Sequence, residues 1–248
     1  MGWYCLILCI LAATLSFTYA VAIVTLTSDF GTKNYLAGAF KGRLLQQHPG
    51  CSLVDITHDI PPFNFSEAAY IITNSVSHFP DHSFHLLLVN LFDTVTSLPV
   101  LAYHKGRYYG VPDNGLLPMV LGEQPDLAIM LPISAKQQYN SLAWADLFGK
   151  AIHHIEGGLA LDSLGRQADM LLEKMKLQAN YTDDYIDGRI IFIDRFENVI
   201  VNITREDFDR IGRGREFTLM FKSRDSITRI SDGYPQVSEG SYLAFFNA

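Results

Sequence analysis

From residue 21 onward, short apolar runs alternate with longer stretches whose apolar positions recur every three or four residues. The runs AIVTLT, SLVDIT and FHLLLVNL are typical of buried strands. The stretches between them, NYLAGAFKGRLLQQH and NFSEAAYIITNSVSHF, have helical spacing, and the second opens with Asn64 and Glu67 at capping-box spacing. Strands that alternate with helices in this way predict an α/β fold with a largely parallel sheet.

Further along, PVLAYHKGRYYGVPDNG predicts a hairpin that turns at Lys105-Gly106, and LAWADLFGKAIHHIEGG predicts a helix that ends at its two glycines. The pattern then changes to short runs that predict β-strands: RIIFID, VIVNIT, EFTLMFKS and SYLAFFNA. We therefore predict a Rossmann-like α/β domain over residues 21–176, a polar linker over 177–188 and a smaller all-β domain over 189–248.

The first twenty residues hold an apolar core followed by Thr-Tyr-Ala, but no Lys or Arg. We interpret residues 1–20 as a signal peptide or as the product of a start codon set too far upstream, and we exclude them from the fold. The first interpretation predicts a secreted or periplasmic protein that has no membrane segment after processing. The second predicts a cytoplasmic protein, which the lone Cys51 in the body of the chain also suits.

The net charge of −7 argues against a nucleic-acid partner, and the chain contains no dense run of Lys or Arg. Phosphate-loop and zinc-finger patterns are missing, and so are a nucleophile elbow and a Ser-His-Asp order. The sequence therefore gives no sign of these common catalytic or binding motifs.

Three short stretches contain candidate chemistry. Asp29, in TSDFG, ends a strand, and a carboxylate at that place can accept hydrogen bonds from both hydroxyls of a ribose. On spacing alone we favour the alternative, in which Asp29 caps a helix or stabilises a turn. In VDITHDIPPFN, His58 and its acidic neighbours suggest a metal site, but we favour a structural turn because further ligands are missing.

The third stretch is FIDRFENVIVNI, which contains an acid, an aromatic residue and an amide on a β pattern. Asp194 and Asn198 could hold the ammonium and carboxylate of an amino-acid ligand, with the face of Phe196 close to a cation. A polar hairpin turn is the alternative interpretation.

In combination, five segments resemble the S-adenosyl-L-methionine (SAM) hydroxide adenosyltransferase family, which includes the SAM-dependent fluorinases and chlorinases. The segments occur in family order: LTSDFG, YLAGAFKGRLL, VDITHDIPPFNFSEAAYII, YYGVPDNGLL and IFIDRFENVIVNI. The resemblance implies a barrel-like C-terminal domain and a homotrimer that binds SAM between one subunit's N-terminal domain and its neighbour's C-terminal domain. It also implies displacement of methionine at the ribose 5′ carbon, by water or by halide, with SAM as the substrate and no metal or other cofactor.

Carried over by position, the resemblance makes Asp29, with the adjoining Phe30, a contact of the nucleoside. It makes Asp194, Phe196 and Asn198 contacts of the methionine end. Hydrolytic members carry an Asp, an Arg and a His that activate water, and here the matching positions are Asn90, Ser97 and Ala143. None of these three side chains can replace the group that the family uses.

The acids left near these positions are Asp93 and Asp146, so our candidate catalytic residues are Asn90, Asp93 and Asp146. A halide site is disfavoured because the bulky Trp144 falls where a small group is expected, although Thr94 or Thr96 could donate hydrogen bonds to one. The chain also ends before the family's final strand, which suggests a truncated C-terminal domain. We predict a SAM hydrolase that releases adenosine and methionine; the alternatives are a degenerate SAM- or adenosine-binding protein and a secreted protein recruited to another small ligand.

Overall fold

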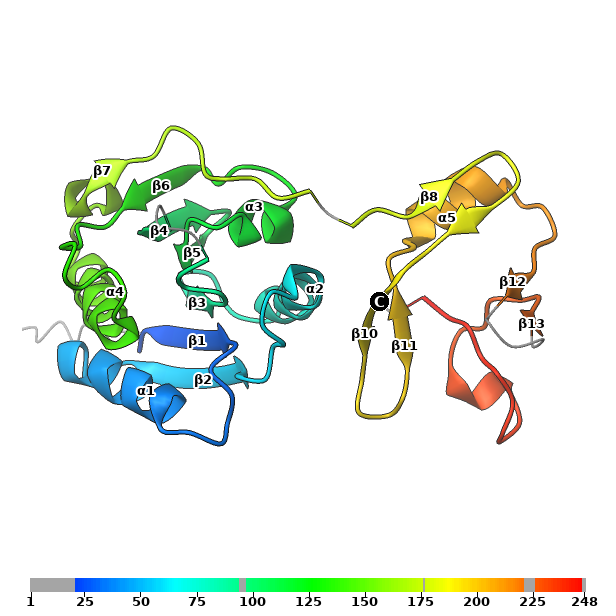
Figure 1. Cartoon of the computed structure of the whole chain (residues 1–248), viewed down its shortest axis with the longest axis horizontal. Helices are drawn as coiled ribbons and strands as arrows, with labels where there is room; N and C mark the ends of the chain where they lie inside the picture. The colour runs from blue at the N-terminus through cyan, green and yellow to red at the C-terminus, as the bar shows by residue number, and fades with distance from the viewer. Residues whose placement is uncertain (1–20, 94–96, 176, 221–225, 247–248) are drawn as a thin grey trace, which may run out of the picture.

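The computed structural model describes residues 21–93, 97–175, 177–220 and 226–246. The predictions for residues 1–20 and for Thr94 and Thr96 lie outside the described residues. Figure 1 shows an N-terminal α/β part joined to a smaller C-terminal part by an extended segment. The α/β fold class predicted from the sequence is confirmed.

A seven-stranded sheet forms the centre of the N-terminal part, with strand order β2-β1-β3-β5-β4-β6-β7. Strands β2, β1, β3, β5 and β6 point the same way, and β4 and β7 run against them. Most strands of the sheet therefore share one direction, as predicted, and the pairs β5–β4, β4–β6 and β6–β7 are antiparallel. The strands are β1 (Ile23–Ser28), β2 (Ser52–Thr57), β3 (Phe84–Leu88), β4 (Pro99–His104), β5 (Arg107–Pro112), β6 (Leu127–Met130) and β7 (Arg166–Gln167).

Helices cover both faces of this sheet (Figure 1). Helices α1 (Leu36–Gln47) and α4 (Ser141–Glu156) pack together over one core, which contains Phe40, Trp144 and Phe148. Helices α2 (Phe65–Val76) and α3 (Leu116–Leu121) cover a second core on the opposite face. Because both faces are covered, β3 is buried at every position, which explains why its sequence is a continuous apolar run.

Local sequence signals fix several boundaries. Asn64 caps α2, because its Oδ1 accepts the N–H group of Glu67 at 3.2 Å. Its Nδ2 donates to Glu67 Oε2 at 2.7 Å, but its backbone N–H group donates to the carbonyl of Pro61, so the reciprocal backbone bond of a capping box does not form. The hairpin turn between β4 and β5 is confirmed, with φ of 44° at Lys105 and 84° at Gly106. Such positive φ values match a turn to the right-handed twist of its strands.

The C-terminal part differs from the prediction in three ways. The segment 177–188, predicted to be a linker, carries the ladder of β8 (Asn180–Tyr181) with β9 (Ile186–Asp187). Helix α5 (Arg205–Gly212) interrupts the expected all-β pattern. Thr204 caps this helix, since its Oγ1 accepts the N–H group of Asp207. The described part of SYLAFFNA, residues 241–246, forms no strand.

The β content of this part is confirmed, in the form of separate antiparallel pairs. Strand β10 (Ile190–Ile193) pairs with β11 (Val199–Val201), and β12 (Leu219–Met220) pairs with β13 (Ser226–Ile227). The described strands do not close into a barrel. The hairpin β10–β11 contacts α2, where the ring centroids of Tyr70 and Phe192 are 6.0 Å apart. Two short 3-10 helices complete the elements: η1 (Leu161–Leu164) and η2 (Tyr234–Gln236).

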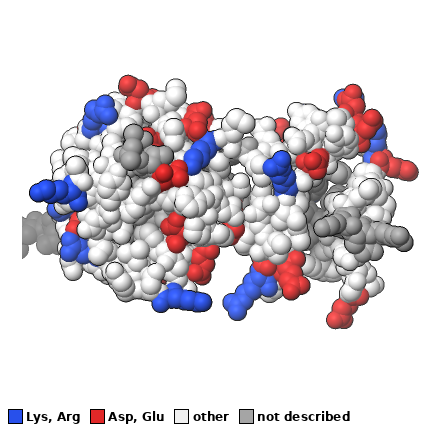
Figure 2. Space-filling view, viewed as in Figure 1, with Lys and Arg blue, Asp and Glu red and all other residues white. Residues whose placement is uncertain are grey.

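On the face shown in Figure 2, Lys and Arg side chains are scattered among acidic ones. Within the described ranges, no helix is both long enough and apolar enough to cross a bilayer.

We predict that Phe148→Ala lowers the free energy of unfolding by about 3–5 kcal/mol, because it leaves a cavity where the fully buried ring packs beside Trp144. Met170→Ala is the control, since that residue is 69% exposed and its loss is expected to change stability by less than about 0.5 kcal/mol. Urea unfolding measures both. Equal effects would mean that the core under α1 and α4 is not packed as described.

Candidate functional site

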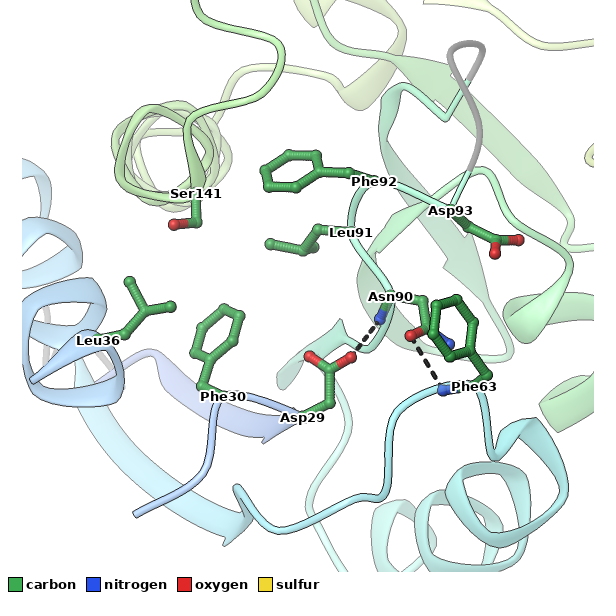
Figure 3. Close-up of a pocket in the computed structure, with 9 residues that line it drawn as sticks. All are labelled: Asp29, Phe30, Leu36, Phe63, Asn90, Leu91, Phe92, Asp93 and Ser141. Atoms are coloured by element: carbon green, nitrogen blue, oxygen red, sulfur yellow. Dashed lines mark hydrogen bonds between the residues drawn. The ribbon is translucent and has the colours of Figure 1, made fainter. Parts of the chain in front are cut away.

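A cavity of about 380 Å³ opens where β1 and β3 end. After β1 the chain forms α1 and β2 on one side, and it then crosses the other face through α2 to reach β3 on the opposite side of β1. The loops that leave β1 and β3 therefore diverge, and such a switch point is where open α/β sheets bind ligands. Figure 3 shows the lining residues: Asp29, Phe30, Leu36, Phe63, Asn90, Leu91, Phe92, Asp93 and Ser141.

Asp29 is the half-buried acid at the end of β1. Its Oδ2 accepts the backbone N–H group of Asn90 at 2.8 Å, and its other oxygen is directed away from Asn90 (Figure 3). Burial raises the pKa of Asp29 above its ordinary value of 3.8, and the N–H group of Asn90 offsets part of this effect. The structure therefore holds a carboxylate at the cavity at a cost in solvation, and an acceptor oxygen remains for a ligand.

A row of side-chain contacts fixes the turn that carries Asp29. Ser28 Oγ lies 2.6 Å from His58 Nδ1 and accepts the N–H group of Phe30 at 3.3 Å. His58 Nε2 lies 3.1 Å from Asp55 Oδ1, within ion-pair distance but without a well-aligned hydrogen bond. The structure thus assembles a Ser, a His and an Asp that the sequence order did not reveal. Because Ser28 is completely buried, we assign the set to positioning the turn and not to nucleophilic attack.

Asn90 follows β3 in a left-handed conformation, with φ of 48°, which Asn tolerates better than most residues. Its Oδ1 accepts the N–H group of Phe63 at 3.1 Å, so its Nδ2 is the donor side of the amide. Asn90 Nδ2 is buried, and no described residue accepts its hydrogen bond. Buried donors in proteins almost always have a partner, so within the described residues this amide is an exception at the wall of the cavity.

Asp93 belongs to the same loop, but its carboxylate is paired with a residue from far along the chain. Asp93 Oδ2 lies 2.7 Å from Lys174 Nζ. In Figure 3 the carboxylate projects away from Phe30 and Leu36, beyond Asn90. Sequence reasoning missed Lys174, since a single Lys in a polar segment gives no signal of such a contact.

Comparisons with known proteins identify the family of this chain. The profile of the SAM hydroxide adenosyltransferase N-terminal domain matches residues 24–165, and that of the C-terminal domain matches residues 188–248. The chain belongs to the SAM hydroxide adenosyltransferase family.

The chain is similar to proteins named SAM hydrolase and to proteins named fluorinase. A protein named (R)-S-adenosyl-L-methionine hydrolase from Methanocaldococcus jannaschii is 30% identical over 190 residues, which are 75% of this chain and 68% of that protein. One of the same name from Thermus thermophilus is 27% identical, covering 72% and 73%. A fluorinase from an Actinoplanes species is 24% identical, covering 79% and 76%.

A solved structure supports the fold. An uncharacterized conserved protein from Thermotoga maritima superimposes with a TM-score of 0.72 at 21% identity, over 90% of this chain and 88% of that one.

Of the three candidate catalytic residues, Asn90 and Asp93 line the cavity and Asp146 does not. Asp146 lies on α4, where its carboxylate pairs with the guanidinium of Arg43 and accepts from Gln47 Nε2 at 3.2 Å. These contacts join α4 to α1. In place of Asp146, helix α4 contributes Ser141 to the cavity, which the sequence analysis did not single out.

Our argument against a halide site depends on Trp144, which is also absent from the residues that line the cavity. It is fully buried, its Nε1 donates to the carbonyl of Gln138 at 2.8 Å, and its ring meets the edge of Phe92 with centroids 6.0 Å apart. Trp144 therefore lies in the core behind Phe92, and the expectation that its bulk disfavours a halide site stays a prediction.

Of the predicted substrate-binding residues, Asp29 and Phe30 lie in the cavity, whereas Asp194, Phe196 and Asn198 lie together on the turn between β10 and β11. Asp194 Oδ1 accepts the N–H groups of Phe196 and Asn198 at 2.8 and 2.9 Å, and Oδ2 accepts from Asn198 Nδ2 at 2.7 Å. The amide of Asn198 is the main cause that lowers the pKa of Asp194. The turn is not part of the cavity lining in its own chain.

We predict that Asp29→Asn is more stable than the wild type at pH 7. Because the pKa of Asp29 is raised on folding, the folded protein holds this proton more tightly than the unfolded chain, so stability falls as the pH rises through that pKa. The amide removes the buried charge and keeps an acceptor for the N–H group of Asn90. The advantage should shrink as the pH falls toward 3.8.

Urea unfolding at several pH values tests this, with the exposed Asp59→Asn as the control that should show no such difference. A variant less stable than the wild type at pH 7 would contradict the cost that we assign to the buried carboxylate.

Proposed function

We propose that this protein binds SAM in the cavity at the ends of β1 and β3 and cleaves it with water to adenosine and methionine. The observation that supports this most is the half-buried carboxylate of Asp29, which the N–H group of Asn90 holds where β1 and β3 diverge. The chain also belongs to the SAM hydroxide adenosyltransferase family. A carboxylate with a spare acceptor oxygen suits the paired hydroxyls of a ribose.

In the proposed reaction a water oxygen bonds to the ribose 5′ carbon as the bond from that carbon to sulfur breaks. The bond pair goes to sulfur, which leaves as the neutral thioether of methionine, and the water proton passes to solvent. SAM is itself the reactant, so the reaction needs no cofactor. Because the sulfonium is already a good leaving group, holding water and SAM in line supplies much of the catalysis.

The candidate catalytic residues have different parts in this proposal. We propose that Asn90, which lines the cavity, donates from Nδ2 to the water or to a ligand oxygen once SAM is bound, because this group lacks an acceptor among the described residues. An amide cannot remove a proton, and the Asp93 carboxylate is engaged by Lys174. We therefore expect slower turnover than in relatives that keep the family's Asp, Arg and His.

We also propose a homotrimer in which the turn between β10 and β11 completes the cavity of a neighbouring chain and binds the methionine end of SAM. Phe63 and Phe92 at the cavity are 71% and 41% exposed, and Phe196 on the turn is 87% exposed. The proposed contact between neighbouring chains would cover these exposed aromatic side chains. The self-complementary bonds of Asp194 and Asn198 keep the turn in shape for such a contact.

The second candidate is a SAM- or adenosine-binding protein without turnover. It is favoured by the loss of all three water-activating groups, at Asn90, Ser97 and Ala143. The two candidates share the cavity and differ only in whether product forms.

The deciding experiment incubates the full chain with SAM and follows adenosine and methionine by chromatography. We expect both products in equal amounts, and we expect Asp29→Ala to weaken SAM binding roughly 10- to 100-fold because a hydrogen bond to a charged group is lost. Asp59→Asn is the control that should behave as the wild type.

Calorimetric titration with adenosine separates the two candidates. Binding that Asp29→Ala loses, in the absence of products, would establish the binding protein and exclude hydrolysis. If neither products nor binding is found, both candidates are wrong.

Sedimentation velocity tests the assembly. We expect a species of three chains for the wild type and a shift toward single chains for Phe196→Asp, because a carboxylate would be buried at the contact. The side chain of Phe196 is almost fully exposed in one chain, so circular dichroism should show an unchanged fold. A wild type that sediments as a single chain would contradict the trimer.

A further inference from the structure

Lys174 is the most unusual charged residue near the cavity, because it comes from the segment that joins the two parts of the chain. This segment is fastened to the N-terminal part before Lys174 is reached. The N–H group of Leu171 donates to Gln124 Oε1 at 3.0 Å, and that of Leu172 donates to Asp113 Oδ1 at 2.8 Å. The backbone that carries Lys174 is therefore held in place independently of its side chain.

The Lys174 side chain occupies a shaped slot. Its Nζ lies 3.6 Å from the ring centroid of Phe65, at the start of α2, and 2.7 Å from Asp93 Oδ2. A Cβ on Gly115 would come within 2.5 Å of Lys174 Cγ, and Gly115 has φ of +91°. The slot thus requires a glycine at that position, and it provides both an aromatic face and a carboxylate for the ammonium.

One turn links this slot to the cavity. Asp113 accepts from the backbone at Leu172, and the next residue, Asn114, donates from Nδ2 to the carbonyls of Val89 and Asn90 at 2.9 and 3.2 Å. The segment with Lys174 and the loop after β3 are therefore fixed to the same few residues. The ion pair of Lys174 with Asp93 is a further contact between this segment and the end of the loop after β3.

The pair of Lys174 with Asp93 is less exposed than another Lys–carboxylate pair of the same length in this protein. Lys105 Nζ also lies 2.7 Å from its partner, Glu123, but the two side chains are 70% and 54% exposed, against 33% and 14% for Lys174 and Asp93. Exposed pairs contribute little, whereas removing one partner of a largely buried pair leaves a charge without compensation.

We propose that Lys174 is a positioning residue that holds Asp93, and through it the loop Asn90–Asp93 that forms one wall of the cavity. Asp93 then acts as the anchor of this loop and not as the base that accepts the proton of water. The orientation of its carboxylate, away from Phe30 and Leu36, follows from this role (Figure 3). The effect on turnover rests on the proposed function, but the effect on the loop does not.

A double-mutant cycle distinguishes an anchor from a base. We expect Lys174→Met and Asp93→Asn each to lower kcat/KM for SAM cleavage by a similar factor of about 10, and the double variant to lose no more than either. Lys174→Arg should keep activity within about threefold, and the matched control Lys105→Met should match the wild type. If Asp93→Asn costs on the order of 100-fold more than Lys174→Met, Asp93 is a base and the proposal is wrong.

A second readout does not depend on turnover. Phe92 in the loop touches the ring of Trp144, and the only other tryptophan in the chain is Trp3. In a Trp3→Phe background we expect acrylamide to quench Trp144 fluorescence more strongly in Lys174→Met and Asp93→Asn than in Lys105→Met. Unchanged quenching would overturn the proposal. If the wild type does not cleave SAM, the proposed function fails, and the quenching experiment still decides whether Lys174 holds the loop.

Discussion

The parallel pairing of β1 with β3 determines where every part of the candidate site lies. Because the chain visits β2 between these two strands and uses opposite faces of the sheet for α1 and α2, the loops after β1 and β3 separate. The N–H group of Asn90 bridges the two strand ends by binding the Asp29 carboxylate. This single hydrogen bond brings the acid of one strand and the loop of the next into one wall.

The cavity wall is irregular backbone that side-chain amides hold in place. Asn114 satisfies two carbonyls of the loop after β3, and Asn90 satisfies the N–H group of Phe63. Buried backbone groups outside regular structure need such partners. Asn at position 90 preserves the left-handed backbone that an Asp would also tolerate, but it replaces a carboxylate with an amide donor. The backbone at the end of β3 can therefore stay the same while the chemistry of the side chain at position 90 changes.

The sequence predicted the elements that have strong periodicity or clear end signals, such as α1, α2 with its Asn64 cap, and the hairpin β4–β5. It did not predict α3, β6 or the ladder β8–β9, because elements of two to six residues are too short for a periodic signal. Of the site, Asp29, Asn90 and Asp93 were found from strand ends and family position. The supporting contacts of His58 and Lys174 were not, because they depend on which loops meet in space. Asp146 was chosen because it lies close in sequence to a family motif, but its carboxylate binds Arg43 and Gln47 on α1 and does not line the cavity.

The turn between β10 and β11 has a consequence for binding kinetics. Asp194 uses both of its oxygens to hold the backbone and side chain of its own turn, and the hydroxyl of Tyr234 donates to Asn198 Oδ1 at 2.9 Å. The turn is therefore ordered before anything docks on it. A molecule or surface that meets Phe196 has little conformational entropy to remove from the protein, so association need not wait for a folding step.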